Sequence, residues 1–190
     1  MRAGIYAGIA SSGADVSVRL GKIEIAGTVM DGSDDVKNDM SLYSYGLSDA
    51  KIEKAMIRQK AAALSLRFHP LNGSFFFGLS AGTTESTGDL LISSNLDSSI
   101  MISEKYKTNR TITGISVGNH WTPGGVIIGC EWFGLVAGSK VKTQTESSSS
   151  GTENSDMTSE RRNFDRSYDD IATKNTSSGL ILSLGFMLGV

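Results

Sequence analysis

The last thirteen residues of the chain, Ser178 to Val190, alternate strictly between large apolar and smaller or mixed side chains. Leu, Phe and Val occupy the even positions from Leu180 onward, and Ile, Ser, Gly and Met occupy the odd ones. Successive side chains of a β-strand point to opposite faces of its sheet. The pattern therefore predicts a strand with a bulky apolar face toward lipid and a smaller face toward a crowded interior.

The same alternation recurs along the chain and gives eight predicted strands. They lie near residues 2–10, 14–20, 22–31, 57–69, 73–86, 107–121, 125–142 and 178–190. Tight-turn residues separate several of them, such as Pro70 with Gly73 and Pro123 with Gly124. An even number of antiparallel strands can close into a barrel, which leaves no exposed sheet edge.

The connections between these strands are short on one side of the predicted barrel and long on the other. The short turns lie at residues 21, 70–73 and 122–125, and the other side has a tip at 11–13 and polar segments at 32–56, 87–106 and 143–177. Short periplasmic turns and long external loops are typical of bacterial outer-membrane barrels. We therefore expect residues 1–190 to form one all-β domain, an eight-stranded antiparallel transmembrane up-and-down β-barrel with short periplasmic turns and long extracellular loops.

Three segments of the long loops have local patterns of their own. Apolar residues between Leu90 and Ile102 could extend two strands above the lipid as a hairpin. Residues 48–61 could instead form a short helix with Ser48 as its N-cap. The run Ser147–Gly151 favours a flexible loop tip.

Composition excludes several classes of protein. The formal net charge of −2 does not indicate a nucleic-acid partner, and the single cysteine, Cys130, permits no intrachain disulfide. No segment approaches the roughly 20 apolar residues of a membrane helix, but a membrane strand needs only about 9–11 residues. The first residues lack an apolar signal segment, so for a protein of the bacterial cell outer membrane we expect a signal peptide to have been removed.

The alternation predicts which side chains face lipid. The predicted lipid-facing residues are Leu64, Leu66, Phe75, Phe77, Val126, Ile128, Leu182, Leu184 and Phe186. Phe68 and Trp121 precede two short turns, where an aromatic girdle would meet the inner lipid interface. Ordinary apolar surface in a soluble sandwich is the alternative, but it does not explain outward faces that are apolar on every strand. A soluble ligand-binding barrel of the lipocalin kind is a further alternative.

Four charged residues fall on the predicted inner face: Arg19, Glu24, Arg67 and Glu131. An eight-stranded barrel has an interior only wide enough for side chains to fill it. Charges there must pair, because an unpaired buried charge costs several kcal/mol. We therefore predict a polar network that plugs the barrel, with a narrow path for ions or small solutes as the alternative.

Catalysis is a lesser alternative. His69 and His120, with Glu131 and Ser116, could form an acid–base–nucleophile group such as a lipid-modifying enzyme needs. They fall at the inner rim, whereas lipid enzymes of this membrane usually act on the outer leaflet. We expect no catalytic residue, no cofactor and no metal, because no phosphate-binding loop or metal-ligand spacing is present.

The strand–turn–strand units at residues 60–82 and 112–138 resemble those of the small eight-stranded bacterial outer-membrane barrels, the OmpA/OmpX-like group. The resemblance implies a surface-exposed barrel that is inserted by the outer-membrane assembly machinery and surrounded by outer-membrane lipids. It also implies a non-enzymatic role, as a structural membrane component or through surface loops that bind a protein or surface ligand in adhesion.

Overall fold

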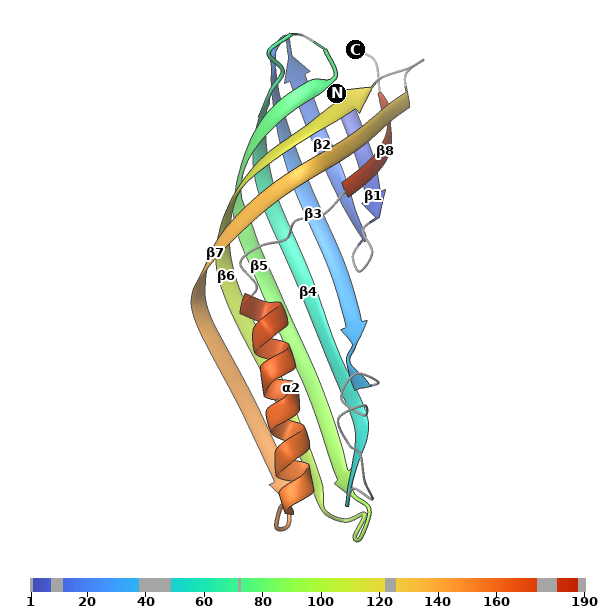
Figure 1. Cartoon of the computed structure of the whole chain (residues 1–190), viewed down its shortest axis with the longest axis vertical. Helices are drawn as coiled ribbons and strands as arrows, with labels where there is room; N and C mark the ends of the chain where they lie inside the picture. The colour runs from blue at the N-terminus through green and yellow to red at the C-terminus, as the bar shows by residue number, and fades with distance from the viewer. Residues whose placement is uncertain are drawn as a thin grey trace.

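The computed structural model describes residues 2–7, 12–37, 49–71, 73–121, 126–173 and 181–187. Eight antiparallel strands and one long helix make up most of this part of the chain (Figure 1). The strands are β1 (Arg2–Ala7), β2 (Ser12–Leu20), β3 (Ile23–Asp35), β4 (Ala50–Phe68), β5 (Phe75–Ser94), β6 (Met101–Trp121), β7 (Val126–Ser150) and β8 (Ile181–Met187), and the helix is α2 (Ser155–Thr173).

The strands form a closed barrel in sequence order, because β8 pairs with both β7 and β1. The register is staggered around this barrel. Paired residues can be followed from Gly4 around the barrel in either direction until they reach β7. The route through β2, β3, β4, β5 and β6 ends at Gly138, whereas the route through β8 ends at Ile127, so the two routes meet β7 at different residues. Such a stagger tilts the strands against the barrel axis. The predicted eight-stranded antiparallel barrel is confirmed.

Four strands, β4 to β7, continue far beyond the closed part of the barrel and form an extended sheet (Figure 1). The prediction of long loops is therefore largely wrong. The predicted loop 87–106 is strand except at 95–100, and the predicted loop 143–177 contains the end of β7 and helix α2. Of the predicted loop 32–56, residues 32–35 and 50–56 are strand.

The local alternatives have different outcomes. The hairpin between Leu90 and Ile102 is confirmed, because β5 and β6 pair up to Ser93 and Met101. The helix over residues 48–61 is wrong from Ala50 onward, where β4 runs. The serine run is not a loop tip either, since Ser147 to Ser150 pair with β6. Charged outward positions obscured the alternation of these strands, whose inward positions carry apolar residues such as Ile57, Leu90 and Ile102 among polar ones.

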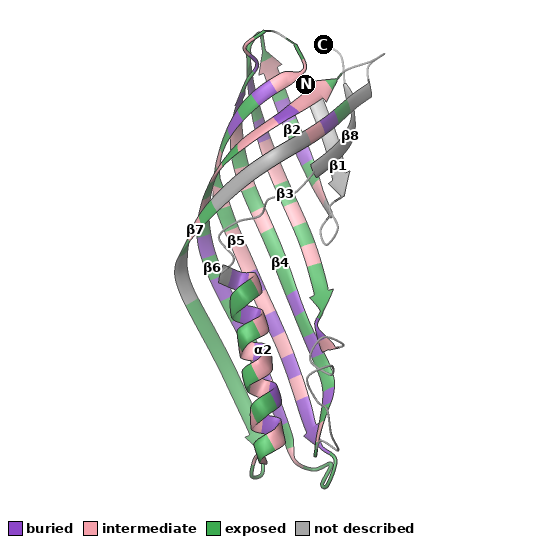
Figure 2. Cartoon of the chain, in the orientation of Figure 1, coloured by how far each residue is buried: buried purple, intermediate pink, exposed green. Residues whose placement is uncertain are grey.

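Helix α2 covers the inward face of the extended sheet (Figures 1 and 2). Asn154 caps it, because its side-chain oxygen accepts a hydrogen bond from the Met157 amide at 2.8 Å. Met157, Phe164 and Tyr168 recur at helical spacing and are buried. No helix in the described residues has both the length and the apolar composition to span a membrane.

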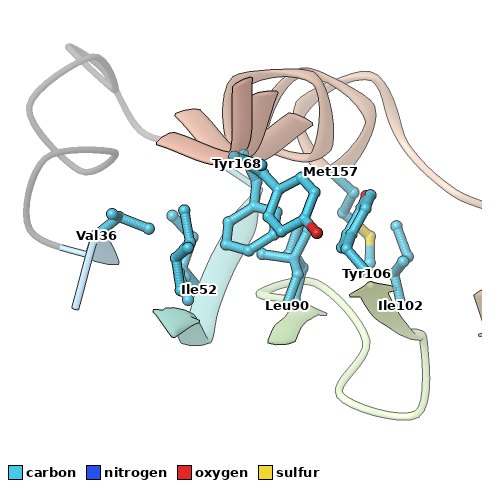
Figure 3. Close-up of a cluster of buried hydrophobic side chains, with 12 residues drawn as sticks. Val36, Ile52, Leu90, Ile102, Tyr106, Met157 and Tyr168 are labelled. Atoms are coloured by element: carbon cyan, nitrogen blue, oxygen red, sulfur yellow. The ribbon is translucent and has the colours of Figure 1, made fainter. Parts of the chain in front are cut away.

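The helix and the sheet share a hydrophobic core outside the barrel (Figure 3). Its buried members are Val36, Ile52, Ala55, Ile57, Leu90, Ile92, Ile102, Tyr106, Met157, Phe164, Tyr168 and Ala172. Tyr106 and Tyr168 pack with ring centroids 5.0 Å apart. This core explains why the long segments between the barrel strands are ordered: burying apolar surface offsets the entropy lost on ordering them.

Gly88 on β5 makes room for this helix. A Cβ atom at position 88 would lie 2.8 Å from Cδ2 of Tyr168. We expect Gly88→Val to weaken the docking of α2 by roughly 1–3 kcal/mol through overpacking. Hydrogen exchange of residues 155–173 should rise in this variant. Gly27→Val is the matched control, because a Cβ there has no atom closer than 3.9 Å; equal exchange in both variants would contradict the packing.

Candidate functional site

A belt of exposed apolar side chains surrounds the described wall of the barrel. It consists of Val16, Val18, Leu20, Ile23, Ile25, Val29, Leu64, Leu66, Phe68, Phe77, Leu79, Ile115, Trp121 and Ile128. Leu64 is 68% exposed, which is unusual for so large an apolar residue inside a regular strand. Monomeric soluble proteins rarely expose continuous apolar surface on this scale.

The belt ends at a row of polar residues that pair across neighbouring strands. Asp31 pairs with Lys60, Lys60 with Glu85, and Glu85 with Asn109. All four occupy outward positions in their strands, and beyond this row the outward face of the extended sheet carries many charged side chains, such as Arg58, Asp89 and Lys107. The change from apolar to charged on one sheet face marks the outer boundary of the belt.

Of the five predicted lipid-facing residues whose side chains are described, all but Phe75 lie in this belt. Leu64, Leu66, Phe77 and Ile128 are exposed. Phe75 is half-buried, with its ring edge-on to Phe77 at 4.9 Å. The side chains of Val126, Leu182, Leu184 and Phe186 lie outside the described part of the chain. The predicted interface aromatics, Phe68 and Trp121, are exposed at the ends of β4 and β6, beside the short turns.

A buried charge network fills the opposite, inward face near the short turns. Arg67 on β4 contacts two carboxylates: its Nη1 lies 3.1 Å from Oε1 of Glu24, and its Nη2 lies 3.1 Å from Oδ2 of Asp15. Glu24 is fully buried and Arg67 is 5% exposed. Three neighbouring strands supply these groups, because positions 15, 24 and 67 all fall on the inward side of the alternation.

Two histidines complete the network around Glu24. Nε2 of His69 lies 3.0 Å from Oε2 of Glu24, and Nδ1 of His120 lies 3.4 Å from Oε1. The ring of Phe76 packs against both histidine rings and lies under the guanidinium of Arg67, whose Cζ is 5.3 Å from the ring centroid. Cation–π contact and ion pairing thus hold the same arginine.

The structure therefore brings together two of the four predicted interior charges, Glu24 and Arg67. Arg19 lies at the turn end of the barrel and donates hydrogen bonds to the carbonyls of Gly21 at 2.9 Å and Gly73 at 3.2 Å. The side chain of Glu131 lies outside the described part. Sequence reasoning missed Asp15, although it alternates in phase with the inward Arg19.

The residues considered for catalysis do not form a relay in the described structure. None of the hydrogen bonds of the described residues joins Ser116 to His69 or His120. Both histidines contact Glu24 instead. Within the same part of the chain, no group of three His, Cys, Asp or Glu residues is arranged to hold a metal ion.

Above the network, the inner wall carries small side chains that are only partly buried. These inward residues are Thr28, Ala61, Ala63, Ser65, Ser80, Gly82, Thr84, Gly114 and Ser116. Among the described residues, the large inward side chains of the barrel, such as Arg67, His69 and Phe76, lie at its short-turn end.

The C-terminal end of α2 is held to the outer end of this wall. Nη1 of Arg110 donates to the carbonyl of Ala172 at 2.9 Å, and Gln59 donates to the carbonyl of Ile171 at 2.8 Å. A cation at a helix C-terminus is favourable because it meets the negative end of the helix dipole. A Cβ at Gly138 would lie 2.6 Å from Nη2 of Arg110, so this glycine makes room for the guanidinium.

Buried tyrosines provide polar contacts between α2 and the extended sheet. The Tyr106 hydroxyl contacts Glu104 on its own strand and Asp165 on the helix. Burial, followed by these two carboxyl groups, raises the pKa of Tyr106 well above its ordinary value. The Tyr168 hydroxyl donates to the carbonyl of Ser86 at 2.9 Å. Sequence reasoning could not find these contacts, because they need the unpredicted helix.

Comparison with known proteins agrees with this architecture. No protein-family model matches the sequence, and no curated protein matches it. A major outer membrane protein of Thermus thermophilus has a similar structure, with a TM-score of 0.52 and 11% identity over 97% of this chain and 96% of that one. Acinetobacter baumannii CarO is also similar over 98% and 96% of the two chains, with a TM-score of 0.41 and 10% identity. The closed eight-stranded barrel, its apolar belt and the Thermus likeness together show that this chain has the fold of a bacterial outer-membrane β-barrel.

Proposed function

We propose that this protein is a non-enzymatic integral barrel of the bacterial outer membrane. Lipid surrounds the apolar belt, the charge network around Glu24 closes the periplasmic end, and the extended sheet with α2 stands outside the membrane. The barrel serves as an anchor, and the sheet and helix form a structured surface for contact with other molecules.

The observation that carries this proposal is the hydrophobic core between α2 and the extended sheet. Flexible loops need no hydrophobic core. A surface that must keep one shape needs one, because the core offsets the entropy lost when the chain is ordered. The outward face of the same sheet suits water, because it carries cross-strand ion pairs: Lys54 with Asp89 at 2.9 Å and Lys107 with Glu85 at 2.6 Å. Such exposed pairs add little stability, so they support solubility at this face.

Labelling of intact cells tests the placement of this surface. We expect Ser99→Cys, in the exposed hairpin between β5 and β6, to react with a membrane-impermeant maleimide in a Cys130→Ala background. Leu71→Cys, in the β4–β5 turn, is the control and should react only after the outer membrane is broken. Labelling of Leu71→Cys but not Ser99→Cys in intact cells would reverse the proposed orientation.

A narrow channel is the second candidate, and the small, partly exposed side chains inside the barrel favour it. We nevertheless expect no steady conductance in planar bilayers, because Arg67, Glu24 and Phe76 fill the periplasmic end. Bilayers that contain the Arg67→Ala variant should show no conductance, or only brief openings. Steady openings of the unmodified protein that Arg67→Ala alters would favour the channel.

A further inference from the structure

An apolar groove of about 430 Å³ lies on the outer face of β4, β5 and β6, within the belt. Two rows of side chains, each paired across the three strands, form its walls. One row consists of Leu66, Leu79 and Ile115, and the other of Phe68, Phe77 and Val117.

The floor of the groove is main chain. Gly78 and Ser116 lie between the two rows, and both direct their side-chain positions into the barrel: a Cβ at Gly78 would lie 2.4 Å from Oγ of Ser116. No side chain therefore rises between the rows. The next outward row of the same three strands consists of Leu64, Ala81 and Thr113, so the bulky walls on β5 and β6 end at this level of the belt.

We propose that this groove binds one acyl chain of a phospholipid, an inference that rests on the proposed function. The row containing Phe68 adjoins the short turns, which places the groove at the depth of the inner leaflet. Its walls offer no charged or hydrogen-bonding side chain to orient a polar ligand. Its volume falls in the range of about 300–1,000 Å³ that is usual for small-ligand sites.

Close packing is the physical basis of this binding. Lipid tails are as apolar as leucine, so moving a tail from bulk lipid to the groove gains nothing from the hydrophobic effect. The tail gains contacts instead, because two walls and a floor touch it along its length. A phospholipid seated here should therefore exchange more slowly than its neighbours and stay with the protein when the bilayer is dissolved.

Native mass spectrometry tests the proposal on protein folded into vesicles of palmitoyl-oleoyl phosphatidylethanolamine and then extracted in mild detergent. We expect the unmodified protein to retain one phospholipid and Ile115→Trp, which fills the groove, to lose it. Val117→Phe provides a second, milder filling variant. The matched control is Val18→Trp, because Val18 belongs to the same cross-strand row through Ile25 but lies outside the groove.

The possible outcomes distinguish a failure of the proposed phospholipid site from a failure of the proposed membrane location. If Val18→Trp retains the phospholipid and both Ile115→Trp and Val117→Phe lose it, the groove is the binding site. If all variants retain the phospholipid equally, or if the bound species has the mass of a free fatty acid or detergent, the phospholipid site is overturned. When gel migration also shows an inserted barrel, this result leaves the proposed function standing. Failure of the unmodified protein to insert into the vesicles overturns the site and the proposed function together.

Discussion

Arg67→Met is expected to lower the free energy of unfolding by about 3–5 kcal/mol, the usual cost of removing one partner of a buried ion pair. The substitution leaves Glu24 and Asp15 buried without the guanidinium that now lies 3.1 Å from each of them. Equilibrium unfolding in urea, with the protein in lipid vesicles, measures the loss.

Two comparisons sharpen this expectation. Lys54→Met breaks an exposed pair with Asp89 and should cost less than about 1 kcal/mol. Combining Glu24→Gln with Arg67→Met should cost less than the sum of the two single changes, since the stranded carboxylate is neutralised. A strictly additive double variant would contradict a network in which these two residues depend on each other.

Leu66→Arg should destabilise the inserted protein by about 2–4 kcal/mol if the residue lies near mid-bilayer. Leu66 is 49% exposed, so in water the same substitution would change the stability by no more than about 0.5 kcal/mol. Unfolding from vesicles again provides the measurement. Asn109→Arg is the matched control, because Asn109 lies on the same outward face in the polar row that bounds the belt.

A second control addresses orientation within the strand. Ser65→Ala changes the neighbouring inward residue and should cost much less than Leu66→Arg. Similar losses for Leu66→Arg and Asn109→Arg would show that the belt is not surrounded by lipid.

The barrel could be predicted from the sequence because its signal is local. Period-two alternation, as in Leu64, Leu66 and Phe68, needs no knowledge of the partner strand, and the turn at Pro70 defines where two strands end. The same alternation put Glu24 and Arg67 on one inner face. It could not show that His69 and His120 share Glu24, because contacts across strands depend on the register.

The extended sheet and helix α2 could not be recognised in the same way. Ile52 and Ile57 lie among charged residues such as Lys54. A membrane strand has an apolar outer face, so a segment with so many charges is interpreted as a polar loop. The helix has apolar residues such as Phe164 and Tyr168 at helical spacing, but they are few and lie among charged and polar neighbours. Only the sheet that these residues pack against makes the helix stable, since short isolated helices are marginal in water.

Folding of the purified chain in the presence and absence of phospholipid vesicles tests the central claim, that lipid surrounds the belt from Val16 to Ile128. In gel electrophoresis, the sample incubated with vesicles should migrate differently before and after heating, and the sample without lipid should show one unfolded position. A compact, folded monomer in detergent-free buffer would contradict the account.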